Sequence, residues 1–181
     1  MPAVHARERM LMIWEFKRIG GMRALEPTAG QALAYPVLLD PSYLTNYMTK
    51  SEAAYCAWNP IDCTYAWDSS KKALAQARSW YVDSTLYKGI GDAFRHCYWN
   101  GRMEIRLSTD DAYQFATRHE SDSRGVDKEM DMRNNSIGRG IGRSKTGQSS
   151  ATTKVRDACR SAQRQGKLWI IRNGSLVRSS S

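Results

Sequence analysis

Residues 91–100 read Gly-Asp-Ala-Phe-Arg-His-Cys-Tyr-Trp-Asn, and this stretch joins a helical pattern to a row of polar groups. Asp92, His96 and Asn100 follow one another at intervals of four residues, so they share one face of a helix. The apolar side chains between them can turn toward a core. We therefore expect a helix from Asp92 to about Arg106 whose polar face meets a partner helix.

Start and stop signals predict further helices on both sides of this stretch. They place helices at about residues 3–19, 51–58, 60–87, 108–119 and 126–137, with Ser51 as the cap of the second and Pro60 in the first turn of the third. Ser108 and Asp111 have the spacing of a capping box. Residues 138–151 are rich in Gly, Ser, Thr, Arg and Lys, which is typical of a flexible basic connection.

The C-terminal segment predicts one more helix and a hairpin. Thr152 or Thr153 can cap a helix that ends at Gln165, and Asn173-Gly174 between two apolar runs is a strong hairpin signal. The predicted fold is mainly α, a compact multi-helix domain with a small C-terminal β-hairpin. We expect a helix and a proline-containing loop over residues 1–50, the helical core with the polar site over 51–142, and a basic linker, helix and hairpin packed on the same domain over 143–181.

Charge is unevenly distributed along the 181 residues. The net charge is +9, and residues 121–181 hold 13 Lys/Arg against 5 Asp/Glu. A basic region of this kind favours an anionic partner, such as nucleic acid, an anionic membrane or an acidic cognate immunity protein, although a solvated surface gives the same composition. The longest apolar run, Met10–Trp14, is too short for a membrane span, and we expect neither a transmembrane segment nor an ordinary N-terminal signal peptide.

The four cysteines leave two interpretations open. Cys56 and Cys63 flank a turn and could form a disulfide in an oxidising compartment. The spacing of all four suggests no zinc site, and we favour buried free thiols.

Two further polar motifs follow the first. Arg118-His119-Glu120 ends one predicted helix, and Asp131, Asn134 and Asn135 lie on the next. Packed antiparallel, three such helices would bring these groups into one cleft. The alternative is a buried polar network that fixes the packing of the helices.

The three motifs together resemble those of a poorly characterised bacterial domain family. The family pattern is G-D-A-F-R-H-x-x-W (here residues 91–99), H-E (119–120) and M-D-x-x-N-N-x-x-G (130–138), and the likeness extends over about residues 50–178. Such domains occur in secreted proteins and at the C-terminal ends of polymorphic-toxin-like proteins. The resemblance implies an exported effector or toxin, secreted or delivered to a target cell, with hydrolytic activity.

A weaker likeness links Arg95-His96-Cys97-x-x-Asn100 to the catalytic helix of bacterial phospholipases A2, R-H-D-x-x-Y-x-N. In that helix the residue after the histidine is an aspartate that binds calcium. Cys97 stands there in this chain, and sulfur is a poor ligand for a cation that prefers oxygen.

The leading hypothesis is a hydrolase that acts on a phosphate-containing substrate, either nucleic acid or phospholipid. His96 would be a general base or a metal ligand oriented by Asp92, while His119, Glu120 and Asp131 would bind a metal or hold a water molecule. The anionic substrate would be held by four side chains: Arg95, Asn100, Asn134 and Asn135. His96, His119 and Asp131 could bind Zn, Mn or Ca, and a metal-free His–Asp dyad is also consistent.

The main rival is a non-enzymatic binding or membrane-disturbing domain, in which the polar cluster is architectural. A nucleic-acid-binding module ranks last, because the sequence carries no helix-turn-helix, zinc-finger or RNA-binding signature.

Overall fold

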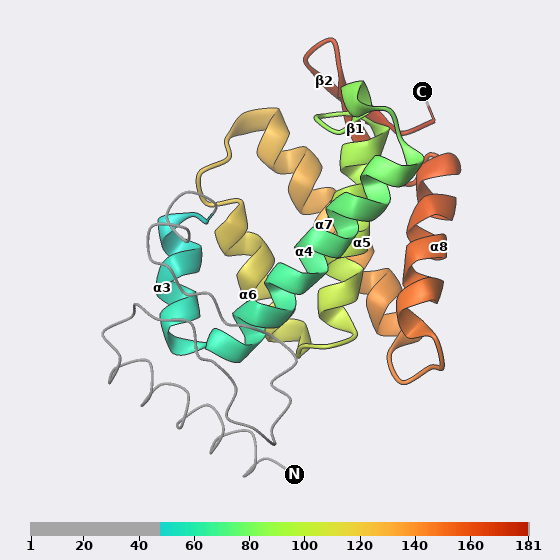
Figure 1. Cartoon of the computed structure of the whole chain (residues 1–181). Coiled ribbons are helices and arrows are strands. Elements are labelled where there is room, and N and C mark those ends of the chain that lie inside the picture. Colours follow the sequence, from blue (N-terminus) through green and yellow to red (C-terminus); the bar gives the residue numbers. More distant parts are fainter. Residues whose placement is uncertain (1–47, 181) are drawn as a thin grey trace. The chain divides into compact units, whose positions relative to one another are not determined.

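The computed structural model describes residues 48–180 and divides the chain into two units, Met1–Thr64 and Tyr65–Ser181. The described part is mainly α-helical and ends in a two-stranded antiparallel hairpin, as the sequence predicts (Figure 1). Its elements are α3 (Lys50–Trp58), α4 (Pro60–Trp80), the 3-10 helix η1 (Asp83–Thr85), α5 (Ile90–Glu104), α6 (Thr109–His119), α7 (Gly125–Lys145), α8 (Ala151–Arg164), β1 (Trp169–Arg172) and β2 (Ser175–Arg178). The expected helix over residues 3–19 and the loop after it lie outside the described residues.

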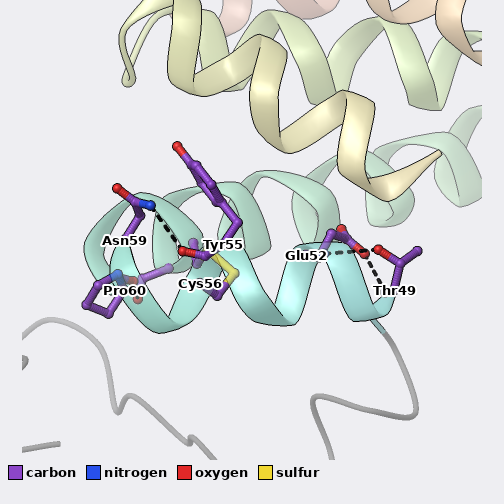
Figure 2. The surroundings of a disulfide bond; sticks show 8 residues. Thr49, Glu52, Tyr55, Cys56, Asn59 and Pro60 are labelled. Carbon is purple, nitrogen blue, oxygen red and sulfur yellow. Dashed lines mark hydrogen bonds between the residues drawn. A yellow bond between two sulfur atoms is a disulfide. The ribbon is translucent and has the colours of Figure 1, made fainter. Parts of the chain in front are cut away.

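In the first unit, Thr49 rather than Ser51 caps α3. The Thr49 hydroxyl accepts a hydrogen bond from the Glu52 amide (3.1 Å), and the Thr49 amide donates to Glu52 Oε2 (2.7 Å), which completes a capping box that Ser51 could not make with this glutamate (Figure 2). Beyond the other end of α3, Pro60 opens α4 as predicted. A disulfide joins Cys56 to Cys63 across this turn.

The helix predicted over residues 60–87 is wrong at its C-terminal end, because α4 stops at Trp80. Val82 is extended (φ −70°, ψ 147°), and its carbonyl accepts hydrogen bonds from the Thr85 hydroxyl (2.8 Å) and the Thr85 amide (2.9 Å). Asp, Ser and Thr offer the backbone such local partners in place of helical ones, and residues 83–85 are Asp-Ser-Thr.

The flexible connection predicted over residues 138–151 is also wrong, because α7 continues unbroken to Lys145. Gly138 and Gly142 lie against α5: a Cβ on Gly138 would be 2.9 Å from the Cα of Cys97 and closer still to its carbonyl oxygen, and one on Gly142 would be 2.5 Å from the Gly101 carbonyl oxygen. These glycines therefore permit close backbone packing and are not flexible joints. The antiparallel packing that we expected is wrong for α5 and α7, which run parallel. Asp92 lies close to Asp131 in the N-terminal halves of the two helices, and Glu104 pairs with Arg143 close to their C-terminal ends.

The free thiols that we favoured are absent, because Cys97 on α5 also forms a disulfide, with Cys159 on α8. α5 packs against both α7 and α8 (Figure 1). α8 follows Ser150 directly, so Thr152 and Thr153 lie inside its first turn and do not cap it. Ser150 has φ 54°, a left-handed conformation that sets the start of the helix.

The hairpin forms where Asn173-Gly174 predicts it. Both residues have positive φ (52° and 73°), as this kind of two-residue turn requires, and Trp169 pairs with Arg178. The Ile171 amide donates to the Lys88 carbonyl (2.8 Å), which anchors the first strand to the loop before α5. Among residues 48–180, no helix combines the length and apolar character needed to cross a membrane.

Candidate active site

The imidazole of His96 is the centre of the polar cluster and is only 2% exposed. Its Nδ1 lies 3.1 Å from Asn135 Oδ1 on α7, and its Nε2 lies 2.8 Å from Nη2 of Arg95. An amide oxygen only accepts and a guanidinium only donates, so the proton is on Nδ1 and Nε2 offers its lone pair. Burial, together with the positive charges of Arg95 and His119, holds the pKa of His96 well below its usual value. The ring is therefore neutral at pH 7.

Two carboxylates face the lone pair of His96. Asp131 Oδ1 lies 3.3 Å from Nε2 and Asp92 Oδ1 lies 3.6 Å from it. Asp92 is one helical turn before His96, as the sequence predicts, and it is fixed by the Lys88 amide, which donates to Oδ2 (2.7 Å). Nη2 of Arg95 bonds to Asp92 Oδ1 (2.6 Å). The imidazole nitrogen and one oxygen of each carboxylate lie within 4.8 Å of one another.

Asp131 differs from Asp92 in having no partner for the oxygen that faces the ring. Its Oδ1 is buried and accepts no hydrogen bond from the described part of the chain. Burial, together with the negative charges of Glu120 and Asp92, raises the pKa of Asp131 to about 8. At neutral pH the metal-free protein therefore holds this carboxyl largely in its protonated form.

A second group of polar side chains lies on the Nδ1 side of His96. Glu120 Oε1 is 3.8 Å from Nδ1, and the side chain is 2% exposed. The Oε2 atom accepts from the Ser123 hydroxyl (2.9 Å), whereas Glu120 Oε1 and Asn135 Nδ2 have no hydrogen-bond partner in residues 48–180. Unpaired buried polar atoms are rare, and they often mark a bound species or a functional site.

The sequence did not predict the chain of hydrogen bonds behind His96. Asn135 Oδ1 also accepts from Asn100 Nδ2 (2.6 Å), and Asn100 Oδ1 accepts from Arg139 Nη1 (2.9 Å). Arg139 is buried and lies over the ring of Tyr113, 5.2 Å from its centroid. Its position one helical turn after Asn135 would indicate this contact in a helix that continues past residue 137, whereas the sequence predicts a flexible connection over residues 138–151.

Two of the predicted site residues, Asn134 and His119, make their described contacts outside the group of side chains around Nε2 of His96. Asn134 lies away from the His96 ring and clamps the hairpin: its Nδ2 donates to the Trp169 carbonyl (2.8 Å) and its Oδ1 accepts from the Trp169 amide (2.9 Å). The ring of His119 packs edge-on against Trp99, with 4.8 Å between the centroids. Among the described residues, the three metal-ligand atoms that converge come from Asp92, His96 and Asp131, so that Asp92 stands where we expected His119.

Two members of this cluster are partly exposed to solvent. The side chain of Arg95 is 29% exposed and that of Asp131 is 15% exposed, whereas those of Asp92, His96 and Glu120 are almost fully buried. A substrate would therefore meet the guanidinium of Arg95 and the carboxyl of Asp131 first.

A family model described as "Domain of unknown function (DUF6973)" matches residues 53–167, a segment that contains every residue of the cluster. This agrees with the expected poorly characterised domain family. No curated protein and no solved structure matches the chain.

Proposed function

The chain belongs to this family of domains of unknown function, and we propose that it is a hydrolase acting on a phosphate-containing substrate, either nucleic acid or phospholipid. We further propose that it serves as an effector or toxin that is secreted or delivered to a target cell. The motif resemblance supports this second part, and the excess of Lys and Arg in the last third of the chain is suited to an anionic substrate.

The observation that carries the proposal is the neutral His96 ring with its lone pair between two carboxylates and an arginine. Nε2 lies within 3.6 Å of Asp92, Asp131 and Arg95, and the last two of these side chains are partly exposed. Attack on a phosphate ester requires an activated water and a positive charge near the phosphoryl oxygens. His96, oriented by Asp92, would activate the water, Asp131 would hold the water or a metal ion, and Arg95 would bind the phosphate.

A substitution of His96 tests this proposal. We expect His96→Ala to lower the rate of phosphate-ester cleavage by about a hundredfold or more, because it removes the central nitrogen. Cleavage is measured on single-stranded DNA, RNA and phospholipid vesicles, and circular dichroism checks that the helices are retained. The control is His5→Ala, which lies outside the matched segment 53–167. Equal rates for the two variants would contradict the proposal.

The second candidate is a non-enzymatic binding or membrane-disturbing domain in which this cluster is structural. The continuous hydrogen bonds from His96 through Asn135 and Asn100 to Arg139 favour it, because a buried network of this kind also specifies how helices pack. In that case His96→Ala would lower the melting temperature, and no phosphate ester would be cleaved by either protein.

A further inference from the structure

We infer that Asp92, His96 and Asp131 form a binding site for one divalent transition-metal ion, Zn²⁺ or Mn²⁺, and that Arg95 occupies this site until the ion displaces it. This inference rests on the proposed hydrolysis, because the ion would be the group that activates the attacking water.

The distances between the donor atoms suit a metal ion without large movement. His96 Nε2 is 3.3 Å from Asp131 Oδ1 and 3.6 Å from Asp92 Oδ1. Two ligands that each lie about 2.1 Å from a tetrahedral Zn²⁺ are separated by about 3.4 Å. Two of the three donor pairs therefore already have this spacing, and the two carboxyl oxygens lie within 4.8 Å of each other.

In the metal-free protein, the guanidinium of Arg95 supplies the positive charge beside these donor atoms. Its Nη2 is 2.6 Å from Asp92 Oδ1 and 2.8 Å from His96 Nε2, so one nitrogen bridges two of the three donors. The arginine is also the most exposed member of the cluster, with 29% of its side chain accessible, and it can leave toward solvent. A displaced guanidinium would remain beside the ion, where it could bind a phosphate.

The third donor shows that the arginine does not complete the site. Asp131 Oδ1 is buried and has no hydrogen-bond partner among residues 48–180, although it lies 3.3 Å from the same Nε2 atom. A metal ion would satisfy all three donors at once. Unpaired buried polar atoms are rare, and this oxygen lies beside the buried His96 ring where a cation would satisfy it.

The contacts behind the donors hold them in the orientation that a metal site needs. Asn135 Oδ1 accepts from His96 Nδ1 and so leaves Nε2 free for the ion, and the Lys88 amide fixes the far oxygen of Asp92. One imidazole with two carboxylates suits Zn²⁺ or Mn²⁺, whereas Ca²⁺ and Mg²⁺ prefer oxygen ligands alone.

Titration of the metal-depleted full chain with ZnCl₂ or MnCl₂ tests the inference by isothermal calorimetry. Reductant and phosphate are left out, because free thiols and phosphate bind these ions. We expect one ion per chain, and Asp131→Asn to weaken binding about tenfold or more. Arg95→Met keeps the length of the side chain without its charge, and we expect it to bind the ion about tenfold more tightly, as it would if Arg95 fills about nine sites in ten.

The matched control is Arg143→Met, which removes an arginine that pairs with Glu104 (3.0 Å) outside the cluster and should leave metal affinity unchanged. If circular dichroism shows that Arg95→Met is unfolded, Arg95→Lys replaces it, with tighter binding again expected because the planar fork is lost. The inference is overturned if neither protein binds one ion per chain, or if the Arg95 variant binds no more tightly than the unaltered chain.

Two results separate this inference from the proposed function. Full phosphate-ester cleavage by metal-depleted protein that binds no ion in the titration would overturn the metal site and leave the hydrolase standing. Binding of one ion with the expected Arg95 effect, but no cleavage of any phosphate ester, would overturn the hydrolase and leave the metal site standing.

Discussion

The two halves of the α5–α7 contact differ in how closely the two helix backbones approach each other. In the C-terminal halves, Gly101, Gly138 and Gly142 let the two backbones touch. In the N-terminal halves, His96, Asp131 and Asn135 fill the same interface with polar groups, and Asp131 Oδ1 and Asn135 Nδ2 have no hydrogen-bond partner in the described chain.

This difference indicates how the protein can keep an unfavourable polar cluster. Close backbone packing gains dispersion contacts and leaves no cavity, whereas unpaired buried polar atoms cost free energy of folding. The glycine half therefore stabilises the helix pair, and the polar half is tolerated because of it. Substitutions of Gly138 and of Asp131 should therefore change stability in opposite directions.

The largest expected effect is that of Gly138→Ala. The new methyl group would lie 2.9 Å from the Cα of Cys97, and the clashing atoms are backbone that cannot rotate away. We expect a loss of about 3 kcal/mol or more in the free energy of unfolding, measured by urea denaturation. Gly140→Ala is the control on the same helix, since nothing lies within 4 Å of the added methyl group, and it should stabilise the protein by about 0.5–1 kcal/mol. Equal effects of the two substitutions would refute the packing role of Gly138.

We expect Asn134→Ala to lower the free energy of unfolding by less than Gly138→Ala does. This substitution removes both hydrogen bonds to the backbone of Trp169 and leaves its amide and carbonyl without those partners. The expected cost is about 2 kcal/mol by thermal or urea unfolding. Ser136→Ala, an exposed position on the same helix, should change little. An unchanged stability in Asn134→Ala would return this asparagine to the list of substrate-binding candidates.

The expected effect of Asp131→Asn on stability has the opposite sign and depends on pH. Because the pKa of Asp131 is raised to about 8 in the folded protein, the native state holds a proton that the unfolded chain releases near pH 4. Stability from this group is therefore present at low pH and falls as the pH rises from about 4 to 8. Asp131→Asn mimics the protonated acid and should stabilise the metal-free protein at pH 8.5 but not at pH 4, measured by urea denaturation in EDTA. A constant difference across this range would contradict the burial of a protonated acid.

Local signals predicted the elements of the fold well. The Ser108 hydroxyl accepts from the Asp111 amide (3.0 Å), Pro60 opens α4, and Asn173-Gly174 forms the hairpin turn. These structures depend on residues within four positions of one another. The glycines of α7 were misread because glycine favours both flexible segments and close helix packing, and only the partner helix decides between them.

The difference between local signals and contacts with distant residues also explains which parts of the candidate site the sequence predicted. Asp92 and His96, like Asp131 and Asn135, share a helix face because they are four residues apart, and the structure brings the two pairs together. The direction of His119 depends on how α6 packs against Trp99, and the Cys97–Cys159 bond joins residues that are 62 positions apart. No local pattern encodes either contact.

The Cys97–Cys159 disulfide closes a covalent ring that contains Glu120, Asp131 and Asn135. A protease that cuts the exposed chain at Arg124, between α6 and α7, would open one peptide bond without releasing a fragment. The nicked protein would keep its full mass until a reductant separates the two pieces. Limited digestion of this domain therefore has to be followed on reducing gels, because non-reducing gels would report an intact chain.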